Sequence, residues 1–481
     1  MATIVEKDKI TKGFGTKDRP VTQEVWDREQ FFPEHASLNV DGEIEPNRRH
    51  FSYAIYTDPN FAKLEHSYVW EKSWLFVGRD EDLPAVGDRM PVNVGARSYM
   101  IVRSGEDDFK AYYNSCPHRG TELCVKKENA ESIRCPYHGW EWQNGGKLKR
   151  ISSHWDFKEI TPLNGNLPEV RLERWGGFLF INADKDAPSL MDALGFIPEH
   201  FKEFDYGNRY TFGHFRREMN CNWKVCQEAF QEAYHLYTTH PEAAPFAGDA
   251  QGKYDIWETK GGHIGRNSTY SAIASALAPA DLSPVASAQM FMQATGDWHY
   301  PGYPVPELDP SKDLRKQVSD WVRDAFKAKH GRETAVPDAI LLDSLLYFFY
   351  PHSCFWLSEA VPFTYQFWPH ATDPNKSYFE VRMLYPVKAG EKRPPAAERV
   401  DLGPDDSIFA AMQDKFGFLA YVFDQDCGNL PRVQRGSHSF NLDKPQTHLG
   451  AYQESIIQQW NTLIVGAVEK GIEARAKAAA E

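Results

Sequence analysis

The sequence lacks the features that would place the protein in a membrane, outside the cell or on nucleic acid. No uninterrupted apolar stretch approaches the roughly 20 residues that span a bilayer. The N-terminal segment carries charges but no apolar core, so it is not typical of a secretory signal. The net charge is −13 at pH 7, and an acidic surface disfavours nucleic acid and anionic membranes. We therefore expect a cytoplasmic protein with no nucleic-acid or membrane partner.

Cysteine is scarce as well. Seven cysteines, an odd number in 481 residues, do not make a disulfide framework. In a reducing compartment a minority of them can instead serve as metal ligands. The rest of the composition, with 42% hydrophobic and 25% charged residues, is that of an ordinary globular protein.

A chain of this length is too long for one compact core and predicts two domains. Residues 1–50 are polar and weakly periodic, and they predict an N-terminal arm or a disordered tail. Residues 51–76 contain an amphipathic helical pattern from residue 59 onward and are expected to pack on the second domain. Short β-rich runs broken by Gly, Asp and Pro fill residues 77–185 and predict a small antiparallel β domain. Residues 186–481 mix helix and strand, so the fold class is α+β.

Within the second domain, four segments have recognisable patterns. Residues 222–239 and 409–422 are helical in pattern. Within residues 245–345, an Ala-, Ser-, Pro- and Met-rich stretch at residues 271–298 predicts helices and loops over a pocket. Aromatic-rich runs between residues 345 and 387 predict strands of a single sheet.

Two short motifs in the small β domain combine cysteine with histidine. Cys116 and His118 lie in C-P-H-R-G, and Cys135 and His138 lie in C-P-Y-H-G-W. Proline restricts the backbone and glycine permits tight turns, so such loops can hold ligands rigidly. Each loop offers one thiolate and one imidazole.

Three interpretations compete for these loops. A structural zinc site accepts two Cys and two His, but its usual modules pair Cys with Cys and His with His. The mixed loops instead allow one iron to take both sulfurs and the other to take both imidazoles, which is the ligation of a Rieske [2Fe–2S] centre. A chance arrangement without metal is the third interpretation. Cys124 is outside both motifs, and we interpret it as a core residue.

A second group of candidate ligands lies in the predicted helix 222–239 and just after it. Glu232 and His235 are about 60° apart around an ideal helix, on one face, but His240 is about 140° from His235. A regular helix could not direct both imidazoles at one metal. Because Pro241 disfavours a helical conformation for the residue before it, we expect the helix to end at or before His240, which allows the two imidazoles to converge.

Two histidines need a third ligand to hold Fe(II). A 2-His-1-carboxylate triad leaves positions open for O₂ and water. The candidate is Asp426, which follows the predicted helix 409–422, and Asp424 is its competitor.

Together these residues resemble the large (α) subunit of Rieske non-heme iron ring-hydroxylating oxygenases, from about residue 51 to 440. The resemblance implies a Rieske domain, then a catalytic domain with an antiparallel sheet of helix-grip, START-like type. It implies Asp426 as the third iron ligand and Asp424 as the neighbouring acid of the site. It also assigns Gln434 to a Q-x-G-like element downstream.

The acid three residues before the first histidine has its own role in this family. The resemblance implies that Glu232 bridges the mononuclear site to a Rieske histidine of a neighbouring subunit, so that electrons cross between subunits. Many members carry Asp at this position. Glu resembles the branch that acts on quaternary amines such as choline or carnitine.

The resemblance therefore implies a terminal oxygenase with a [2Fe–2S] cluster and a mononuclear Fe(II). It would use O₂ and electrons from an NADH-dependent reductase, with or without a ferredoxin, to hydroxylate or dihydroxylate an aromatic or other hydrophobic substrate. Alternatives are a monooxygenase for a quaternary amine and a non-catalytic Rieske carrier fused to a ligand-binding domain. The expected assembly is a homotrimer or an α3β3 hexamer.

Overall fold

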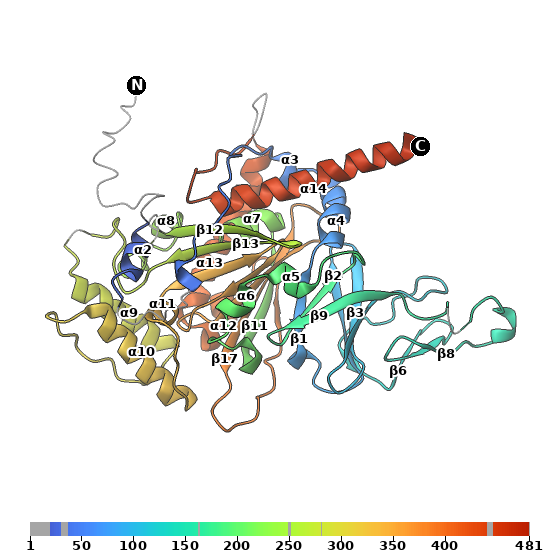
Figure 1. Cartoon of the computed structure of the whole chain (residues 1–481), viewed down its shortest axis with the longest axis horizontal. Coiled ribbons are helices and arrows are strands. Elements are labelled where there is room, and N and C mark those ends of the chain that lie inside the picture. The colour runs from blue at the N-terminus through green and yellow to red at the C-terminus, as the bar shows by residue number, and fades with distance from the viewer. Residues whose placement is uncertain are drawn as a thin grey trace.

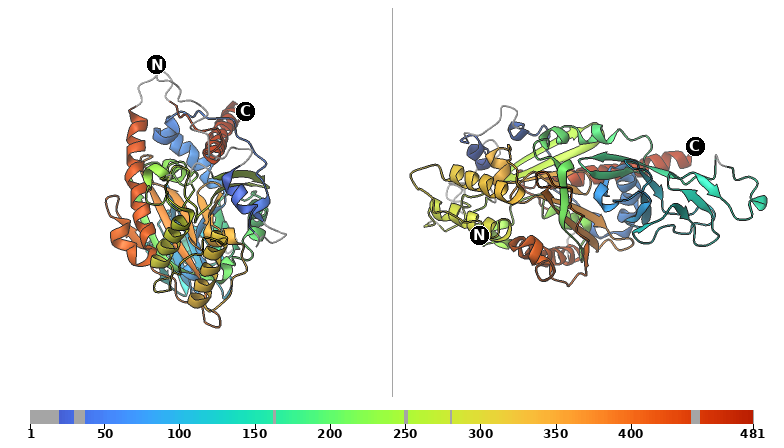
Figure 2. Two further views of the ribbon diagram at one scale, coloured as in Figure 1. Left: turned by 90° about the vertical axis from the view of Figure 1, so that its left-hand side faces the viewer. Right: turned by 90° about the horizontal axis from the view of Figure 1, so that it is seen from below.

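The computed structural model describes residues 20–29, 37–161, 164–248, 252–279, 281–439 and 446–480. A large lobe of helices and sheet continues into a smaller β-rich lobe that reaches one end of the long axis (Figure 1). The view from below shows the same elongated arrangement (Figure 2). Residues 1–19 and 30–36 of the predicted arm lie outside the described residues.

The smaller lobe contains a seven-stranded antiparallel sheet in the order β1-β10-β9-β4-β3-β2-β5. Its strands are β1 (Leu75–Arg79), β2 (Asp88–Val94), β3 (Arg97–Arg103), β4 (Phe109–Tyr113), β5 (Glu128–Asn129), β9 (Glu169–Trp175) and β10 (Phe178–Asn182). A second antiparallel sheet, at the far end of the lobe in Figure 1, consists of β6 (Ser132–Arg134), β7 (Glu141–Gln143) and β8 (Leu148–Arg150). The β-rich character predicted for this region is confirmed, whereas its boundaries at 77 and 185 stay predictions.

The large lobe is built on an eight-stranded sheet in the order β12-β13-β14-β15-β16-β17-β11-β18, in which only β18 pairs in parallel. Its strands are β11 (Arg209–Met219), β12 (Lys253–Thr259), β13 (Gly262–Thr269), β14 (Ser344–Phe349), β15 (Ser353–Trp356), β16 (Phe363–Pro369), β17 (Ser377–Pro386) and β18 (Val400–Leu402). The aromatic-rich runs form β14 to β17, which belong to a single sheet as predicted and are paired with one another in sequence order.

The stretch at residues 271–298 contains a loop followed by helix α9 (Pro284–Trp298), as predicted. The hairpin β12–β13 that precedes it, paired from Lys253↔Ser268 to Thr259↔Gly262, was not predicted. The hairpin forms because Gly261 at the turn takes a φ of +90°, which glycine adopts readily. The predicted helices follow after the hairpin.

Helices pack around the large sheet and contribute to the buried core on both of its faces (Figures 1 and 2). They are α2 (Val21–Trp26), α3 (Ala54–Thr57), α4 (Pro59–Tyr68), α5 (Leu190–Leu194), α6 (Ile197–His200), α7 (Trp223–Glu228), α8 (Leu236–Thr239), α9 (Pro284–Trp298), α10 (Leu314–His330), α11 (Asp338–Leu342), α12 (Ile408–Phe416), α13 (Phe418–His438) and α14 (Ser455–Ala480). The helix predicted from residue 59 is shorter than expected, because α4 ends at Tyr68 and β1 begins at Leu75.

A buried ion pair joins α4 to α7. The Lys224 ammonium contacts the Glu65 carboxylate, and Trp223 Nε1 donates to the same carboxylate at 2.5 Å. Both charged side chains are almost completely buried. Because α7 also contacts β16 and β17, this pair holds the start of the histidine-bearing segment against the sheet.

Among the described residues, none of the helices combines the length and the apolar character needed to cross a bilayer.

Candidate metal centres

The two Cys/His loops of the smaller lobe have the same backbone hydrogen bonds. In the first, the Gly120 N–H donates to the Cys116 carbonyl at 2.8 Å, and in the second the Gly139 N–H donates to the Cys135 carbonyl at 3.1 Å. Both glycines have φ values above +70°, so a side chain at either position would strain the turn. The loops are therefore a matched pair of ligand-bearing turns.

The four predicted cluster ligands come together between these loops. Both cysteines are buried, and the rings of His118 and His138 lie nearer the surface with centroids 4.6 Å apart. The His118 ring stacks on Trp140 at 5.2 Å, which restricts its orientation. Two thiols on the inside and two imidazoles on the outside fit a [2Fe–2S] cluster with sulfur ligands on one iron and nitrogen ligands on the other.

The backbone around Cys135 favours its thiolate. Burial raises the pKa of this thiol, but the N–H groups of Tyr137 and His138 outweigh burial and lower it below its usual value. Burial dominates at Cys116 and raises the pKa of its thiol. Amides aimed at the sulfurs are what a thiolate-bound cluster needs.

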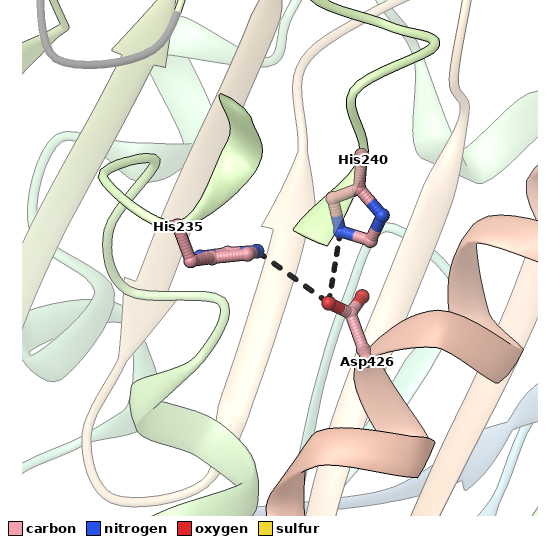
Figure 3. Close-up of side chains that lie close together, drawn as sticks. All are labelled: His235, His240 and Asp426. Atoms are coloured by element: carbon pink, nitrogen blue, oxygen red, sulfur yellow. Dashed lines mark hydrogen bonds and ion pairs between the residues drawn. The ribbon is translucent and has the colours of Figure 1, made fainter. Parts of the chain in front are cut away.

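The second group of ligands forms where α8 and α13 meet (Figure 3). One carboxylate oxygen of Asp426, Oδ1, is 2.9 Å from His240 Nε2 and 3.4 Å from His235 Nε2. The three ligand atoms all lie within 4.8 Å of one another. Two imidazole nitrogens and one carboxylate oxygen on one side of a shared point fit a mononuclear Fe(II) with open positions.

The acidic and imidazole side chains of this site stabilise one another's charged forms. Burial disfavours the His235 imidazolium, but the carboxylates of Glu232 and Asp426 outweigh burial and raise its pKa to about 10. Burial likewise opposes ionisation of Asp426, but both imidazoles lower the pKa of that carboxyl below its usual value. A divalent cation bound here would replace the imidazolium protons and meet an ionised carboxylate.

Each imidazole has an acceptor on its outer nitrogen. Glu232 Oε1 lies 2.7 Å from His235 Nδ1, and Gln425 Oε1 lies 2.8 Å from His240 Nδ1. An amide or carboxylate oxygen accepts there, so Nδ1 carries the proton and Nε2 is left to face Asp426. Such partners set the tautomer of a metal-binding histidine.

The prediction of one helix over residues 222–239 is wrong, although the expected contacts form. α7 ends at Glu228, and the Ala233 N–H donates to Tyr254 Oη at 3.1 Å rather than to the preceding turn. The contact between Glu232 and His235 therefore does not depend on helical spacing. The second expectation is confirmed, because α8 ends at Thr239 and His240 has a non-helical backbone.

Asp424 does not join the metal site. Its carboxylate accepts from Ser407 Oγ at 2.6 Å and from the Ile408 and Phe409 N–H groups, at the start of α12. In a helix, residues 424 and 426 point about 200° apart, so one faces α12 when the other faces the histidines. The helix predicted to end at Val422 is also two helices, separated at Gly417, and Asp426 lies inside the second.

Gln425 was missed by the sequence reasoning, which looked only for acids beside Asp426. The sequence does show an amide next to the carboxylate ligand Asp426. Only the packing of α13 beside His240 shows that this amide can contact the imidazole. Gln434, from the Q-x-G-like element, accepts from the Asn222 N–H at 2.9 Å and so ties α13 to the N-terminus of α7.

The structure combines a pair of Cys/His loops that fit a Rieske cluster with a separate 2-His-1-carboxylate site. This combination is that of a protein with two kinds of iron centre. Family models match the same two regions: "Rieske [2Fe-2S] domain" over residues 73–160 and "Ring hydroxylating alpha subunit (catalytic domain)" over residues 207–470. The chain therefore belongs to the ring-hydroxylating oxygenase α-subunit family, and this membership implies both the cluster and the mononuclear iron.

Relatives of known function match part of the chain. It is 31% identical over 190 residues to the glycine betaine monooxygenase oxygenase subunit of Chromohalobacter salexigens, covering 39% of this chain and 42% of that protein. It is 29% identical over 223 residues to the biphenyl 2,3-dioxygenase subunit alpha of Rhodococcus jostii, covering 45% and 48%. The matched segments span about half the length of these relatives.

Solved structures share the fold over nearly the whole chain. A quaternary ammonium Rieske monooxygenase bound to L-carnitine aligns with a TM-score of 0.58 at 18% identity, covering 91% of this chain and 99% of that one. Naphthalene 1,2-dioxygenase with bound indole aligns with a TM-score of 0.60 at 16% identity, covering 89% and 94%.

Proposed function

We propose that the protein is the terminal oxygenase component of a multicomponent Rieske oxygenase. In this proposal it hydroxylates or dihydroxylates an aromatic or other hydrophobic substrate, using O₂ and electrons that an NADH-dependent reductase supplies, directly or through a ferredoxin. The observation that carries the proposal is the convergence of His235, His240 and Asp426, which come from separate elements of a chain that also carries a matched pair of Cys/His loops.

The proposed ligands of the cluster are Cys116, Cys135, His118 and His138, and those of the iron are His235, His240 and Asp426. The iron, when bound, supplies O₂ activation with electrons from the cluster. The protein's own side chains prepare the site: Glu232 and Gln425 keep the outer nitrogen of each imidazole protonated.

Electron transfer between subunits is the second part of the proposal. Within one chain the cluster loops lie in the smaller lobe at one end of the long axis, whereas α8 lies toward the other end (Figure 1). Glu232 already contacts His235 and can reach a neighbouring chain only if the chains pack head to tail. This geometry supports a homotrimer or an α3β3 hexamer in which Glu232 bridges the two kinds of centre.

A substitution tests the bridge. Glu232→Gln keeps an acceptor for His235 Nδ1 but removes the charge, so both metals should stay bound while single-turnover electron transfer slows. Glu454→Gln is a matched control, because Glu454 lies in the electrostatic field of Glu232 and its recorded hydrogen bond is to the Gly450 N–H. Wild-type single-turnover rates in Glu232→Gln would remove the bridging role.

Metal counting tests the function itself. The proposal requires three irons per chain and a Rieske signal in low-temperature EPR of the reduced protein. His235→Ala should lose one iron and keep the signal. Two irons per chain in the wild type would favour a Rieske carrier fused to a ligand-binding domain instead.

A second candidate function is monooxygenation of a quaternary amine. Glu232 in place of the commoner Asp favours it, as do the matches to glycine betaine and carnitine monooxygenase subunits. Product analysis on aromatic hydrocarbons and quaternary amines, with a surrogate reductase, separates the two candidates.

A further inference from the structure

Tyr365 in β16 is a buried tyrosine whose hydroxyl makes no hydrogen bond within the described part of the chain. Its side chain is 2% exposed, and the recorded contacts of its ring are with aromatic rings. Tyrosine hydroxyls inside a protein usually have a hydrogen-bond partner. Phenylalanine would fill the same space without a hydroxyl to satisfy.

The position of Tyr365 ties it to the metal site. Its ring centroid is 5.1 Å from that of Phe230, which lies two residues before Glu232 in the metal-binding loop. Burial, the Cys354 thiol and the Asp426 carboxylate together raise the pKa of Tyr365, so its hydroxyl lies within the electrostatic field of the proposed iron ligand.

A second aromatic side chain with an unused donor packs against the Tyr365 ring. The ring of Trp356, on the adjacent strand β15, is 5.5 Å from that of Tyr365, and Trp356 Nε1 is buried without a hydrogen-bond partner among the described residues. An indole N–H can only donate. Two aromatic side chains with unused donors therefore lie together on the sheet face that α7 covers.

We propose that Tyr365 and Trp356 donate hydrogen bonds to an uncharged oxygen acceptor on the substrate. This inference rests on the proposed function and narrows its substrate class to apolar or aromatic molecules that carry a carbonyl or ether oxygen. A quaternary ammonium group needs only the aromatic rings and not their donors.

The test compares a ketone with a hydrocarbon of the same shape. Acetophenone and ethylbenzene are titrated calorimetrically into the intact, iron-loaded protein, so neither electrons nor turnover are needed. Wild type should bind acetophenone about tenfold more tightly, which two hydrogen bonds of similar strength would supply. Tyr365→Phe should remove one of them, reduce the preference to about threefold and leave the affinity for ethylbenzene unchanged. Equal affinities in the wild type, or an unchanged preference in Tyr365→Phe, would overturn the proposal.

Thermal stability gives an independent readout and a matched control. Tyr206 Oη donates to the Trp356 carbonyl at 2.7 Å, so Tyr206→Phe should lower the melting temperature and keep the preference for the ketone. Tyr365→Phe should melt at or above the wild-type temperature. If Tyr365→Phe lowered the melting temperature as much as Tyr206→Phe does, the Tyr365 hydroxyl would be bonded within the protein. That result would overturn the proposal. Failure of the proposed function itself would appear in the iron count.

Discussion

Replacing Gln425 tests how the protein prepares an imidazole for iron. Gln425 Oε1 accepts from His240 Nδ1 at 2.8 Å, and the opposite ring nitrogen lies 2.9 Å from Asp426 Oδ1. Gln425→Leu removes the acceptor while keeping most of the volume, so the ring proton is no longer confined to Nδ1 and the ring orientation is less restrained. Loss of such a partner weakens metal binding by about 10–100-fold, or roughly 1.4–2.7 kcal/mol.

The assay is an anaerobic titration of Fe(II) into the apo-protein against a coloured chelator. Gln425→Glu restores an acceptor and should bind iron at least as tightly as wild type. Asn429→Leu is the control: it removes an amide one turn further along α13 that contacts Thr239 at 3.3 Å and has no recorded contact with a proposed ligand. Wild-type affinity in Gln425→Leu would refute the reasoning, and an equal loss in Asn429→Leu would show a general effect on α13.

Three further predictions concern acids that the metal does not contact. Asp424→Ala should lose about 0.5–2 kcal/mol of stability, as for a helix cap, with an unchanged iron content by elemental analysis; loss of iron would return Asp424 to the site. Glu65→Gln leaves the Lys224 ammonium buried without its partner and should cost about 3–5 kcal/mol in denaturant unfolding, whereas Glu65→Leu combined with Lys224→Met should recover most of that loss. Burial raises the pKa of Glu228 to about 7, so the folded state holds this proton more tightly than the unfolded state. Stability should therefore fall between about pH 4.5 and 7, by on the order of 3 kcal/mol, and Glu228→Gln should flatten this part of the thermal-melting profile.

Candidate ligands that lie close in the chain were found from the sequence. Each Cys/His loop is short and bounded by proline and glycine, so the spacing of its residues nearly determines where their side chains can go. The pair His235 and His240 could be found for a related reason, because Pro241 limits the helix before it. The family resemblance, rather than periodicity, placed Asp426 with them.

Asp424 and Gln425 show where sequence reasoning fails. Both are polar neighbours of Asp426, and the spacing of polar residues does not say which face of α13 meets the histidines. The packing of α13 between α12 and α8 decides which face meets the histidines. Asp424 binds the start of α12, and Gln425 contacts His240. The break after α7 is a similar case, because the acceptor Tyr254 that replaces a helical partner lies on a strand that the sequence did not predict.

The sequence by itself therefore determined the α+β class and the family, and it predicted both groups of metal ligands. Local spacing suffices for these, because a few bonded residues constrain one another. Only the tertiary structure decided which polar side chains orient the iron ligands and which buried donors remain unused. Those properties depend on contacts between segments up to about two hundred residues apart, such as His240 with Gln425, and no local pattern encodes them.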